Sequence, residues 1–195
     1  MERVTNFLFV GVGGQGILTA SDIAASVGLE AGMDAKKSEV HGFSQRGGVV
    51  ESHVRWGEDV GAPTAERGTV DTLIAMEILE SARWIDWLRP GGAVFINRQR
   101  IPPMTVTVGD AIYPPEDEIL EVVRARTEDV TLVDALVTAE ELGDARMTNT
   151  VMLGALSTRL EVASEIWLAV IERRVPPRYA SANREAFWQG RRLVG

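Results

Sequence analysis

The feature nearest the start of the chain that could do chemistry is a glycine-rich run, GVGGQG, at residues 11–16. It satisfies the spacing G-x-G-x-x-G, with an apolar stretch before it and a helical pattern after it. Such a turn brings bare backbone N–H groups and a helix N-terminus to one point, where they favour an anion. The same glycines also suit a turn that only lets a strand and a helix pack closely. Glycine spacing alone leaves both interpretations open.

A dinucleotide site of the usual kind needs a carboxylate about 20 residues further on, at the end of the second strand. Asp34 and Glu39 lie in that region, with Lys36 and Lys37 between them. The segment is not a clean strand ending in one carboxylate, so the requirement is half met. An NAD(P)-binding Rossmann dehydrogenase therefore stays open as an alternative. It would also need a proton-transfer pair such as tyrosine and lysine, and neither tyrosine of the chain has a lysine nearby.

A second polar, glycine-punctuated segment, SEVHGFSQRGGV, spans residues 38–49 and leads into a strand pattern. With the glycine turn, it can form one anion-accepting edge at the carboxyl ends of the strands. Lys36 and Lys37 would then act as long-range helpers. The segment holds no nucleophile paired with a general base, so the two stretches predict binding and no catalytic residue.

Composition excludes several other kinds of site. The 195-residue chain has no cysteine, which excludes disulfides, thiolate catalysis and cysteine-ligated iron–sulfur clusters on this chain. It has two histidines and no evident metal-ligand constellation, so we expect no metal. A net charge of −8 argues against nucleic acid as a partner. No leader or apolar stretch long enough for a membrane is evident, so we expect a cytoplasmic protein.

The elements that must position these segments alternate between strand and helix. This order predicts an α/β, Rossmann-like three-layer domain over residues 1–195, with a mostly parallel sheet and helices on both faces. The motif RPGG at residues 89–92 is a stop signal between a helix and a strand. We expect strands over 4–10, 33–40, 49–56, 70–76, 93–97, 104–108 and 130–134, and helices over 15–31, 77–88, 115–127, 135–142, 149–159, 164–173 and 183–192.

The glycine turn, followed in order by SQRGG at residues 44–48 and RPGG at residues 89–92, resembles the gamma-type subunit of the 2-oxoacid:ferredoxin oxidoreductases. The SQRGG form, preceded by EVHG at residues 39–42, is most similar to the small (beta) subunits of indolepyruvate ferredoxin oxidoreductases. VMLGAL at residues 151–156 and the helix over 183–190 resemble the family's later helices. The resemblance therefore covers nearly the whole chain.

This resemblance implies a division of labour between two subunits. The large (alpha) subunit would carry thiamine diphosphate, Mg and the [4Fe-4S] clusters. The complex would oxidatively decarboxylate an aryl pyruvate with coenzyme A, giving an aryl-acetyl-CoA, with ferredoxin as the electron acceptor. The small subunit would be inactive alone. A non-catalytic binding module of the same fold is the other alternative.

Arg46 has two interpretations within this family. Its guanidinium matches the pyrophosphate and 3′-phosphate oxygens of coenzyme A, a possible shared ligand of the two subunits. It equally suits a carboxylate of the partner subunit, which would make it an interface anchor. The candidate ligand-binding residues are Gly11, Gly13, Gly14, Gln15, Gly16, Ser44, Gln45, Arg46, Gly47 and Gly48.

Overall fold

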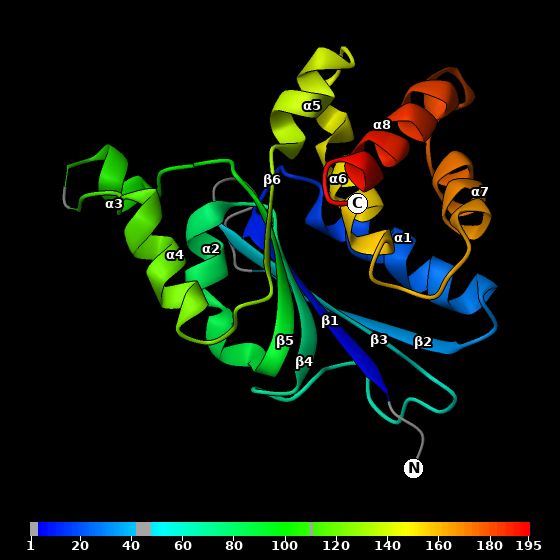
Figure 1. Ribbon diagram of the computed structural model, residues 1–195, viewed down its shortest axis with the longest axis horizontal. Coiled ribbons are helices and arrows are strands. Elements are labelled where there is room, and N and C mark those ends of the chain that lie inside the picture. Colours follow the sequence, from blue (N-terminus) through cyan, green and yellow to red (C-terminus); the bar gives the residue numbers. More distant parts are fainter. Residues whose placement is uncertain (1–3, 42–47, 110) are drawn as a thin grey trace.

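The computed structural model describes residues 4–41, 48–109 and 111–195, and of His41 only the backbone. Its centre is a six-stranded sheet in the order β2-β3-β1-β4-β5-β6 (Figure 1). Strands β1, β4, β5 and β6 run parallel, whereas β3 is antiparallel to both of its neighbours, β1 and β2. The prediction of a mostly parallel sheet is confirmed, with β3 as the exception. The strands are β1 (Thr5–Val12), β2 (Asp34–His41), β3 (Val49–Gly57), β4 (Val70–Ala75), β5 (Leu88–Asn97) and β6 (Val130–Val133).

Helices cover both faces of the sheet, as the three-layer prediction requires. Helices α1, α6, α7 and α8 lie over one face, and α2 and α4 lie over the other (Figure 1). Within the described ranges, no helix combines the length and apolar character needed to cross a membrane. The helices are α1 (Ile17–Glu30), α2 (Ile78–Arg83), α3 (Met104–Thr107), α4 (Glu116–Arg124), α5 (Ala135–Glu141), α6 (Thr148–Ser157), α7 (Ser164–Arg174) and α8 (Ala180–Arg192), with 3-10 turns η1 (Ile85–Trp87), η2 (Ala145–Met147) and η3 (Pro177–Tyr179).

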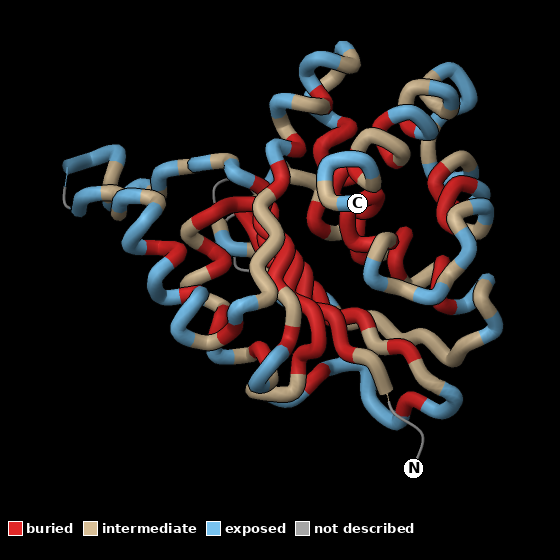
Figure 2. Tube along the Cα trace, viewed as in Figure 1, coloured by how far each residue is buried: buried red, intermediate tan, exposed pale blue. Residues whose placement is uncertain are grey.

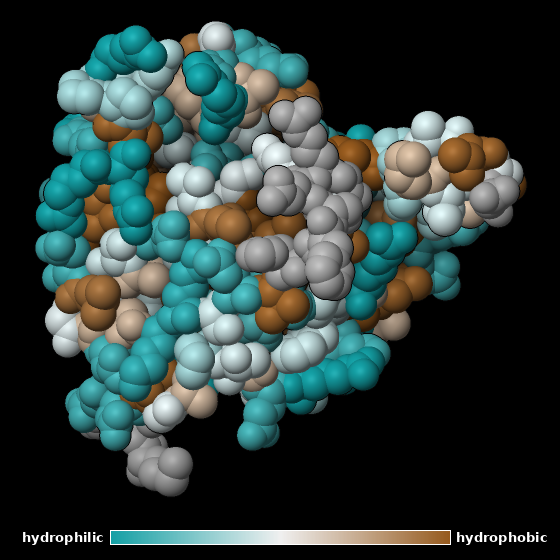
Figure 3. Space-filling view, turned by 180° about the vertical axis from the view of Figure 1, so that it is seen from behind, coloured by the Kyte–Doolittle hydropathy of each residue, from teal (hydrophilic) through white to brown (hydrophobic). Residues whose placement is uncertain are grey.

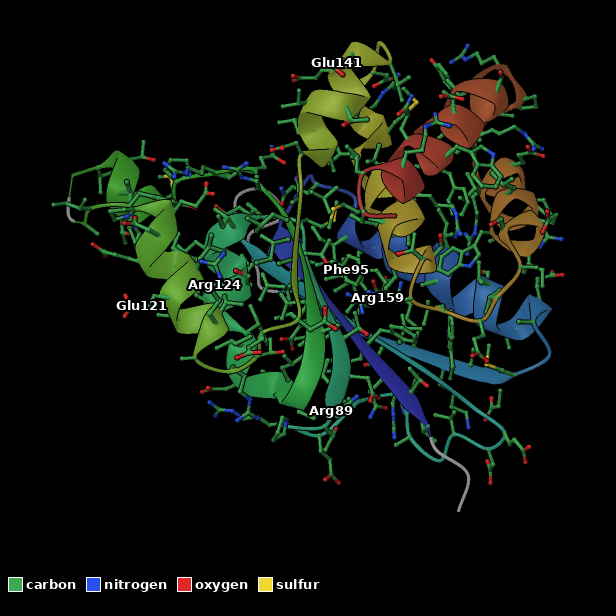
Figure 4. All side chains as sticks on the ribbon, viewed as in Figure 1. Arg89, Phe95, Glu121, Arg124, Glu141 and Arg159 are labelled. Atoms are coloured by element: carbon green, nitrogen blue, oxygen red, sulfur yellow. The ribbon has the colours of Figure 1, made fainter. Side chains whose placement is uncertain are left out.

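The central strands divide the core between the two helical layers. Successive side chains of a strand point to opposite faces, so Phe7 and Phe9 of β1 pack under α1 and α6, while Leu8 and Val10 face α2 and α4. All four are fully buried. Figure 2 shows the central strands as buried along most of their length, and Figure 4 shows Phe95 of β5 between the sheet and the helices above it. The core thus fixes the carboxyl ends of β1, β4 and β5 at one edge.

Two glycines let α6 and α8 cross backbone to backbone. A Cβ atom on Gly154 would overlap the carbonyl oxygen of Phe187, and one on Gly190 would overlap the carbonyl oxygen of Val151. Because neither obstacle is a flexible side chain, the two helices can approach this closely only with glycine at both positions. The crossing fixes the N-terminal ends of α6 and α8 relative to each other.

The predicted strand over residues 104–108 is wrong. These residues form the single helical turn α3, which begins after Pro103. The backbone N–H of Val108 donates to the carbonyl of Met104 at 2.9 Å, and Thr107 Oγ1 donates to the carbonyl of Pro103 at 3.2 Å. β-branched composition favoured a strand. The edge of the sheet beside β5 is taken by β6, so the segment closes its hydrogen bonds locally.

The expected stop at residues 89–92 also differs in the structure. Strand β5 begins at Leu88 and contains this segment as an irregularity, because the pairing passes from Val70–Leu88 directly to Thr72–Ala93. Arg89 Nε donates to Asp71 Oδ1 at 2.6 Å across it. The helix expected over 77–88 is correspondingly shorter: α2 ends at Arg83 and η1 follows.

Candidate functional site

The glycine turn joins β1 to α1 at the carboxyl edge of the sheet. Gly14, with φ 105°, and Gly16, with φ 78°, adopt the left-handed backbone that L-residues rarely take. Gly16 is the N-cap of α1, no side chain caps the helix, and no acidic residue lies in its first turn. The first N–H groups of a helix have no partner within it. The turn therefore presents unsatisfied donors and the positive end of a 14-residue helix.

Gln15 holds this turn in shape. Its Nε2 donates to the carbonyl of Met76 at 2.7 Å and to Gln99 Oε1 at 2.9 Å, and its Oε1 accepts from the Val12 N–H at 2.8 Å. A Cβ on Gly11 would lie 2.7 Å from this Oε1, so Gly11 leaves the room that Gln15 occupies. Both N–H donors of the Gln15 amide are thus used within the protein. These two predicted residues shape the site through the turn.

A buried amide extends the same network to the next strand. Asn97, at the end of β5, is fully buried. Its Nδ2 donates to the Met76 carbonyl at 3.0 Å and to Gln99 Oε1 at 3.2 Å, and its Oδ1 accepts from the Leu136 N–H at 3.4 Å. The carboxyl ends of β1, β4 and β5 and the start of α5 are therefore tied together by two amide side chains.

The structure brings the start of β3 to the glycine turn. The backbone N–H of Gly13 donates to the carbonyl of Gly48 at 2.9 Å. This places Gly48 beside the turn, as predicted. Of the other candidates in that segment, Ser44, Gln45, Arg46 and Gly47 lie outside the described residues.

The two lysines do not join this edge. Lys37 Nζ lies 2.6 Å from Asp22 Oδ1 and 3.6 Å from Glu39 Oε2. Lys36 donates to the Val60 carbonyl and lies 3.3 Å from Asp34 Oδ2. Both side chains are engaged by groups near β2, two strands away from β1.

A cleft of about 830 Å³ opens between the glycine turn and the C-terminal helices. Its walls come from the turn, the segment after β5, the α5–α6 connection and the first turns of α6 and α8. Four of the predicted residues line it: Gly13, Gly14, Gln15 and Gly16.

Three helices begin at this cleft, and none has an acidic residue in its first turn. The cleft is lined by Thr19 of α1, by Thr148, Asn149 and Thr150 of α6, and by Ala182 and Asn183 of α8. In the described chain, none of these helices has an acidic residue in its first turn or a side-chain N-cap bond. The first turns of three helices therefore meet at the cleft without a carboxylate in any of them, an arrangement that favours an anionic ligand. One carboxylate lies nearby: Asp144 caps the 3-10 turn η2 that runs into α6, and it also lines the cleft.

The floor of the cleft is polar although it is buried. Thr148, Asn149 and Thr150 open α6 and are 6%, 8% and 2% exposed. Thr150 Oγ1 donates to Asn183 Oδ1 at 2.7 Å, which joins α6 to α8. A Cβ on Gly16 would lie 3.0 Å from Asn149 Nδ2, so this amide lies directly against the glycine turn. The floor can thus offer hydrogen bonds to a bound polar group.

Two arginines and an aromatic ring form the outer rim. The guanidinium carbon of Arg178 lies 4.8 Å from the centre of the Tyr179 ring, and that of Arg146 lies 5.3 Å from it. Arg146 also pairs with Asp144, with Nη2–Oδ2 at 2.6 Å. These bonds lower the pKa of Asp144 to about 2 and raise the pKa of Arg146, so the pair stays ionised. Arg178 is exposed and adds a cation at the mouth of the cleft.

The residues from α6, η3 and α8 were missed by sequence reasoning, because they lie more than 130 positions after the glycine turn. One signal was available. Thr148-Asn149-Thr150 opens a helix that has no charged residue from 148 to 158, and a polar triplet in that setting indicates a buried polar surface.

Catalytic chemistry of its own is not evident in this site. In the part of the chain that the structure describes, no group of three or more histidine, cysteine, aspartate or glutamate side chains could hold a metal ion. The geometry fits binding and orientation of a phosphate-bearing ligand at the edge of the sheet.

Comparison with known proteins gives consistent results. The model of the family Pyruvate ferredoxin/flavodoxin oxidoreductase matches residues 6–193. The chain is 39% identical to the indolepyruvate oxidoreductase subunit IorB of Pyrococcus horikoshii over 185 residues, which are 93% of this chain and 92% of that one. It is 25% identical to the common gamma subunit of the pyruvate/ketoisovalerate oxidoreductases of Thermococcus kodakarensis, over 92% of this chain and 93% of that one.

A solved structure shares the fold. The 2-oxoglutarate:ferredoxin oxidoreductase of Magnetococcus marinus, determined with 2-oxoglutarate, coenzyme A and succinyl-CoA bound, superimposes with a TM-score of 0.74 at 21% identity. The match covers 100% of this chain but 31% of that one. The fold described above therefore also occurs as a part of a much longer polypeptide.

Proposed function

Because the chain belongs to the pyruvate ferredoxin/flavodoxin oxidoreductase family, we propose that it is the small subunit of an indolepyruvate (aryl-2-oxoacid):ferredoxin oxidoreductase. In this role it supports the CoA-dependent oxidative decarboxylation of aryl pyruvates to aryl-acetyl-CoA, and it has no activity without its large subunit. The observation that carries the aryl assignment is the gap in similarity: 39% identity to an indolepyruvate oxidoreductase subunit against 25% to a gamma subunit of pyruvate/ketoisovalerate enzymes, over nearly the same span.

The chemistry of the side chains supports a partner that carries the redox groups. The sequence has no cysteine, so a [4Fe-4S] cluster would need its thiolates from another chain. Thiamine diphosphate is held through Mg, which prefers carboxylate and carbonyl oxygens. The described residues do not fit that group, since no three acidic or histidine side chains among them are placed to hold a metal ion. We assign thiamine diphosphate, Mg, the clusters and the contact with ferredoxin to the large subunit.

The cleft is our candidate for the coenzyme A site. Coenzyme A supplies the thiol that accepts the acyl group, and it carries a pyrophosphate and a 3′-phosphate. The N–H groups of Gly14 and Gly16 and the first turn of α1 suit the pyrophosphate, whereas the Gln15 N–H donates to the Val12 carbonyl at 3.2 Å. Arg178, which lies over the Tyr179 ring, suits a second phosphate. In this proposal the small subunit binds and orients the cosubstrate, and the reacting centre lies in the partner.

The dehydrogenase alternative loses its main support in the strand order. In a dinucleotide-binding fold the second strand lies beside the first and ends in the carboxylate that contacts the ribose. Here β3 lies between β2 and β1, which moves β2 about 10 Å from β1. Asp34 pairs with Gly57 at the edge opposite the glycine turn, and Glu39 is close to Lys37. Neither carboxylate stands where a nicotinamide dinucleotide would need it.

Reconstitution with the large subunit tests the proposal. The purified chain alone, the large subunit alone and the mixture are assayed with a panel of 2-oxoacids, CoA and oxidised ferredoxin. We expect turnover in the mixture only, fastest with aryl pyruvates. Turnover by the chain alone, or equal rates with pyruvate, would contradict the assignment.

Titration of the isolated chain with NADH, measured by energy transfer from the tryptophans, tests the dehydrogenase alternative. Tight binding of NADH would favour a dehydrogenase over the subunit proposed here. A stable homodimer that associates with no thiamine-containing subunit would favour a non-catalytic binding module.

A further inference from the structure

An apolar arm projects from the edge of the sheet beside the cleft. It comprises residues 101–109 and 111–113, includes α3, and extends beyond the rest of the molecule next to α4 (Figure 1). Seen from behind, the projection carries brown apolar side chains among white and tan ones (Figure 3). Ile112 is 91% exposed, Met104 72% and Val108 61%. Single exposed apolar side chains are common, whereas three on one short projecting segment indicate an interaction surface.

The arm is a built structure with both ends fastened. Glu77, itself 1% exposed, accepts from the Ile101 N–H at 3.0 Å and from Tyr113 Oη at 2.5 Å through the same Oε1. One buried carboxylate thus holds the first and the last residue of the arm. Burial, followed by the bond to Glu77, raises the pKa of Tyr113, which keeps the phenol protonated as the donor.

Hydrogen bonds inside the arm maintain its shape. The N–H groups of Val106 and Thr107 donate to the Pro103 carbonyl at 2.9 and 3.0 Å, and the Ala111 N–H donates to the Thr105 carbonyl at 3.1 Å. Hydrogen bonds fix the backbone of the arm internally and at both ends. The apolar side chains of the arm are therefore held in an exposed position. While exposed, these side chains do not contribute the free energy that burial of apolar surface gives. Burial against another protein would supply that free energy to binding.

The position of the arm and the charges on the adjoining helix α4 indicate one kind of binding partner. Ile101 lines the cleft, so the arm starts at the wall of the candidate ligand site. Asp117, Glu118 and Glu121 are exposed on the adjoining helix α4, and Figure 4 shows Glu121 on the side facing away from the sheet. A groove of about 640 Å³ lies between Tyr113 at the end of the arm and the start of α4, and its lining includes Asp117 together with Arg100 and Arg124.

We propose that the arm is the docking element for the large, thiamine-carrying subunit, and that its apolar residues enter an apolar pocket whose rim carries lysine and arginine. This inference rests on the proposed function. A partner placed there also covers the mouth of the cleft, where a bound cosubstrate must meet the reacting centre. A second copy of this chain is disfavoured, because each copy has a net charge of −8 and the same acidic face beside its arm.

Binding measurements with matched serine variants test the proposal. The double variant Met104→Ser/Ile112→Ser removes apolar surface from the arm. The control Leu29→Ser/Leu193→Ser removes two other exposed apolar side chains, which are 57% and 47% exposed and lie on α1 and after α8. The Kd for the purified large subunit is measured for each, together with the unfolding midpoint. We expect the arm variant to bind about tenfold or more weakly, the control to bind normally, and both to keep the wild-type midpoint.

The acidic face gives a second measurement. In Asp117→Asn/Glu118→Gln/Glu121→Gln, we expect slower association and a weaker dependence of the association rate on salt. An arm variant that binds the large subunit as tightly as wild type would overturn the docking proposal alone. A homodimer of the isolated chain that the arm variant abolishes would also overturn it, since the occupant would be a second copy. Failure of the unaltered chain to bind any large subunit would instead contradict the proposed function and the docking proposal together.

Discussion

The helices that open on the cleft and the helices of the opposite layer differ in their first turns. On the cleft side, α1, α6 and α8 begin without an acidic residue in the first turn, and no described side chain caps them. On the opposite face, α2 begins with Glu77, which accepts from the Glu80 N–H at 3.0 Å, and α4 begins with Glu116, Asp117 and Glu118. The backbone dipole is thus offset by carboxylates in α2 and α4, whereas the three helices that open on the cleft have none in their first turns. Helix α7 lies in the same layer as these three and has Glu165 in its first turn.

This difference shows how a binding site can be recognised without a ligand. A carboxylate in the first turn stabilises an ordinary helix by about 0.3–1 kcal/mol. Three helices whose first turns line one cleft lack that stabilisation, and the positive ends of their dipoles would favour a phosphate. The outer layer keeps its acidic first turns, and Glu116 and Asp117 of α4 line the groove of about 640 Å³ there. The variants below test this contrast.

The largest expected effect is on the crossing that holds the cleft-side helices together. In Gly190→Ala the new Cβ would overlap the backbone of α6, so we expect a loss of about 3–5 kcal/mol in unfolding free energy. Urea denaturation measures it. Gly61→Ala is the matched control, because a Cβ atom on Gly61 would meet no described atom within 4 Å. If the two variants are equally stable, the crossing does not fix the cleft.

The next effect concerns the buried acid of the outer layer. Glu77→Ala leaves the N–H groups of Ile101 and Glu80 and the hydroxyl of Tyr113 without their acceptor. We expect a loss of about 2–3 kcal/mol in unfolding free energy. Amide hydrogen exchange would show faster exchange in α2 and the arm, and little change in α1. Unchanged exchange in the arm would contradict its fastening by Glu77.

A third variant separates stability from binding. Thr19→Asp puts a carboxylate in the first turn of α1, at the cleft. Because it offsets the helix dipole, we expect stability to rise by about 0.5 kcal/mol. Because it repels a phosphate, we expect coenzyme A to bind about tenfold or more weakly to the reconstituted complex. Calorimetry of unfolding and of binding measures both, with Thr19→Ala as the control. An unchanged affinity for coenzyme A would contradict an anion site at the start of α1.

The smallest effect is expected in the outer layer. Glu118→Gln removes an exposed charge from the first turn of α4. We expect a loss of about 0.3–1 kcal/mol in stability and no change in coenzyme A affinity. A clear loss of coenzyme A affinity would contradict the assignment of the anion site to the helices that open on the cleft.

The sequence was sufficient where local pattern and burial agree. The apolar strands predicted over 4–10 and 70–76 form over 5–12 and 70–75, and the glycine turn and the helix after Pro115 also form, because periodicity and turn chemistry act over a few residues. Residues 104–108 failed because β-branched side chains favour a strand only where a neighbouring strand is free to pair.

The candidate site could be predicted only in part, for a reason of distance along the chain. Four residues of the glycine turn do line the cleft, and Gly48 lies beside the turn. The opposite wall comes from Asn149, Arg178, Tyr179 and Asn183, and no spacing rule links these residues to a turn at residues 11–16. Tertiary packing of α6 and α8 brings them there.

The reversed strand β3 also determines where reagents can attach. Both lysines of the sequence lie on β2, the edge strand that β3 displaces from the centre of the sheet, and Lys36 is the more accessible of the two. Coupling through lysine amines would therefore tether the protein by one edge. A sensor surface prepared in this way would present the cleft and the arm in a uniform orientation, which is the geometry that measurements on the large subunit require.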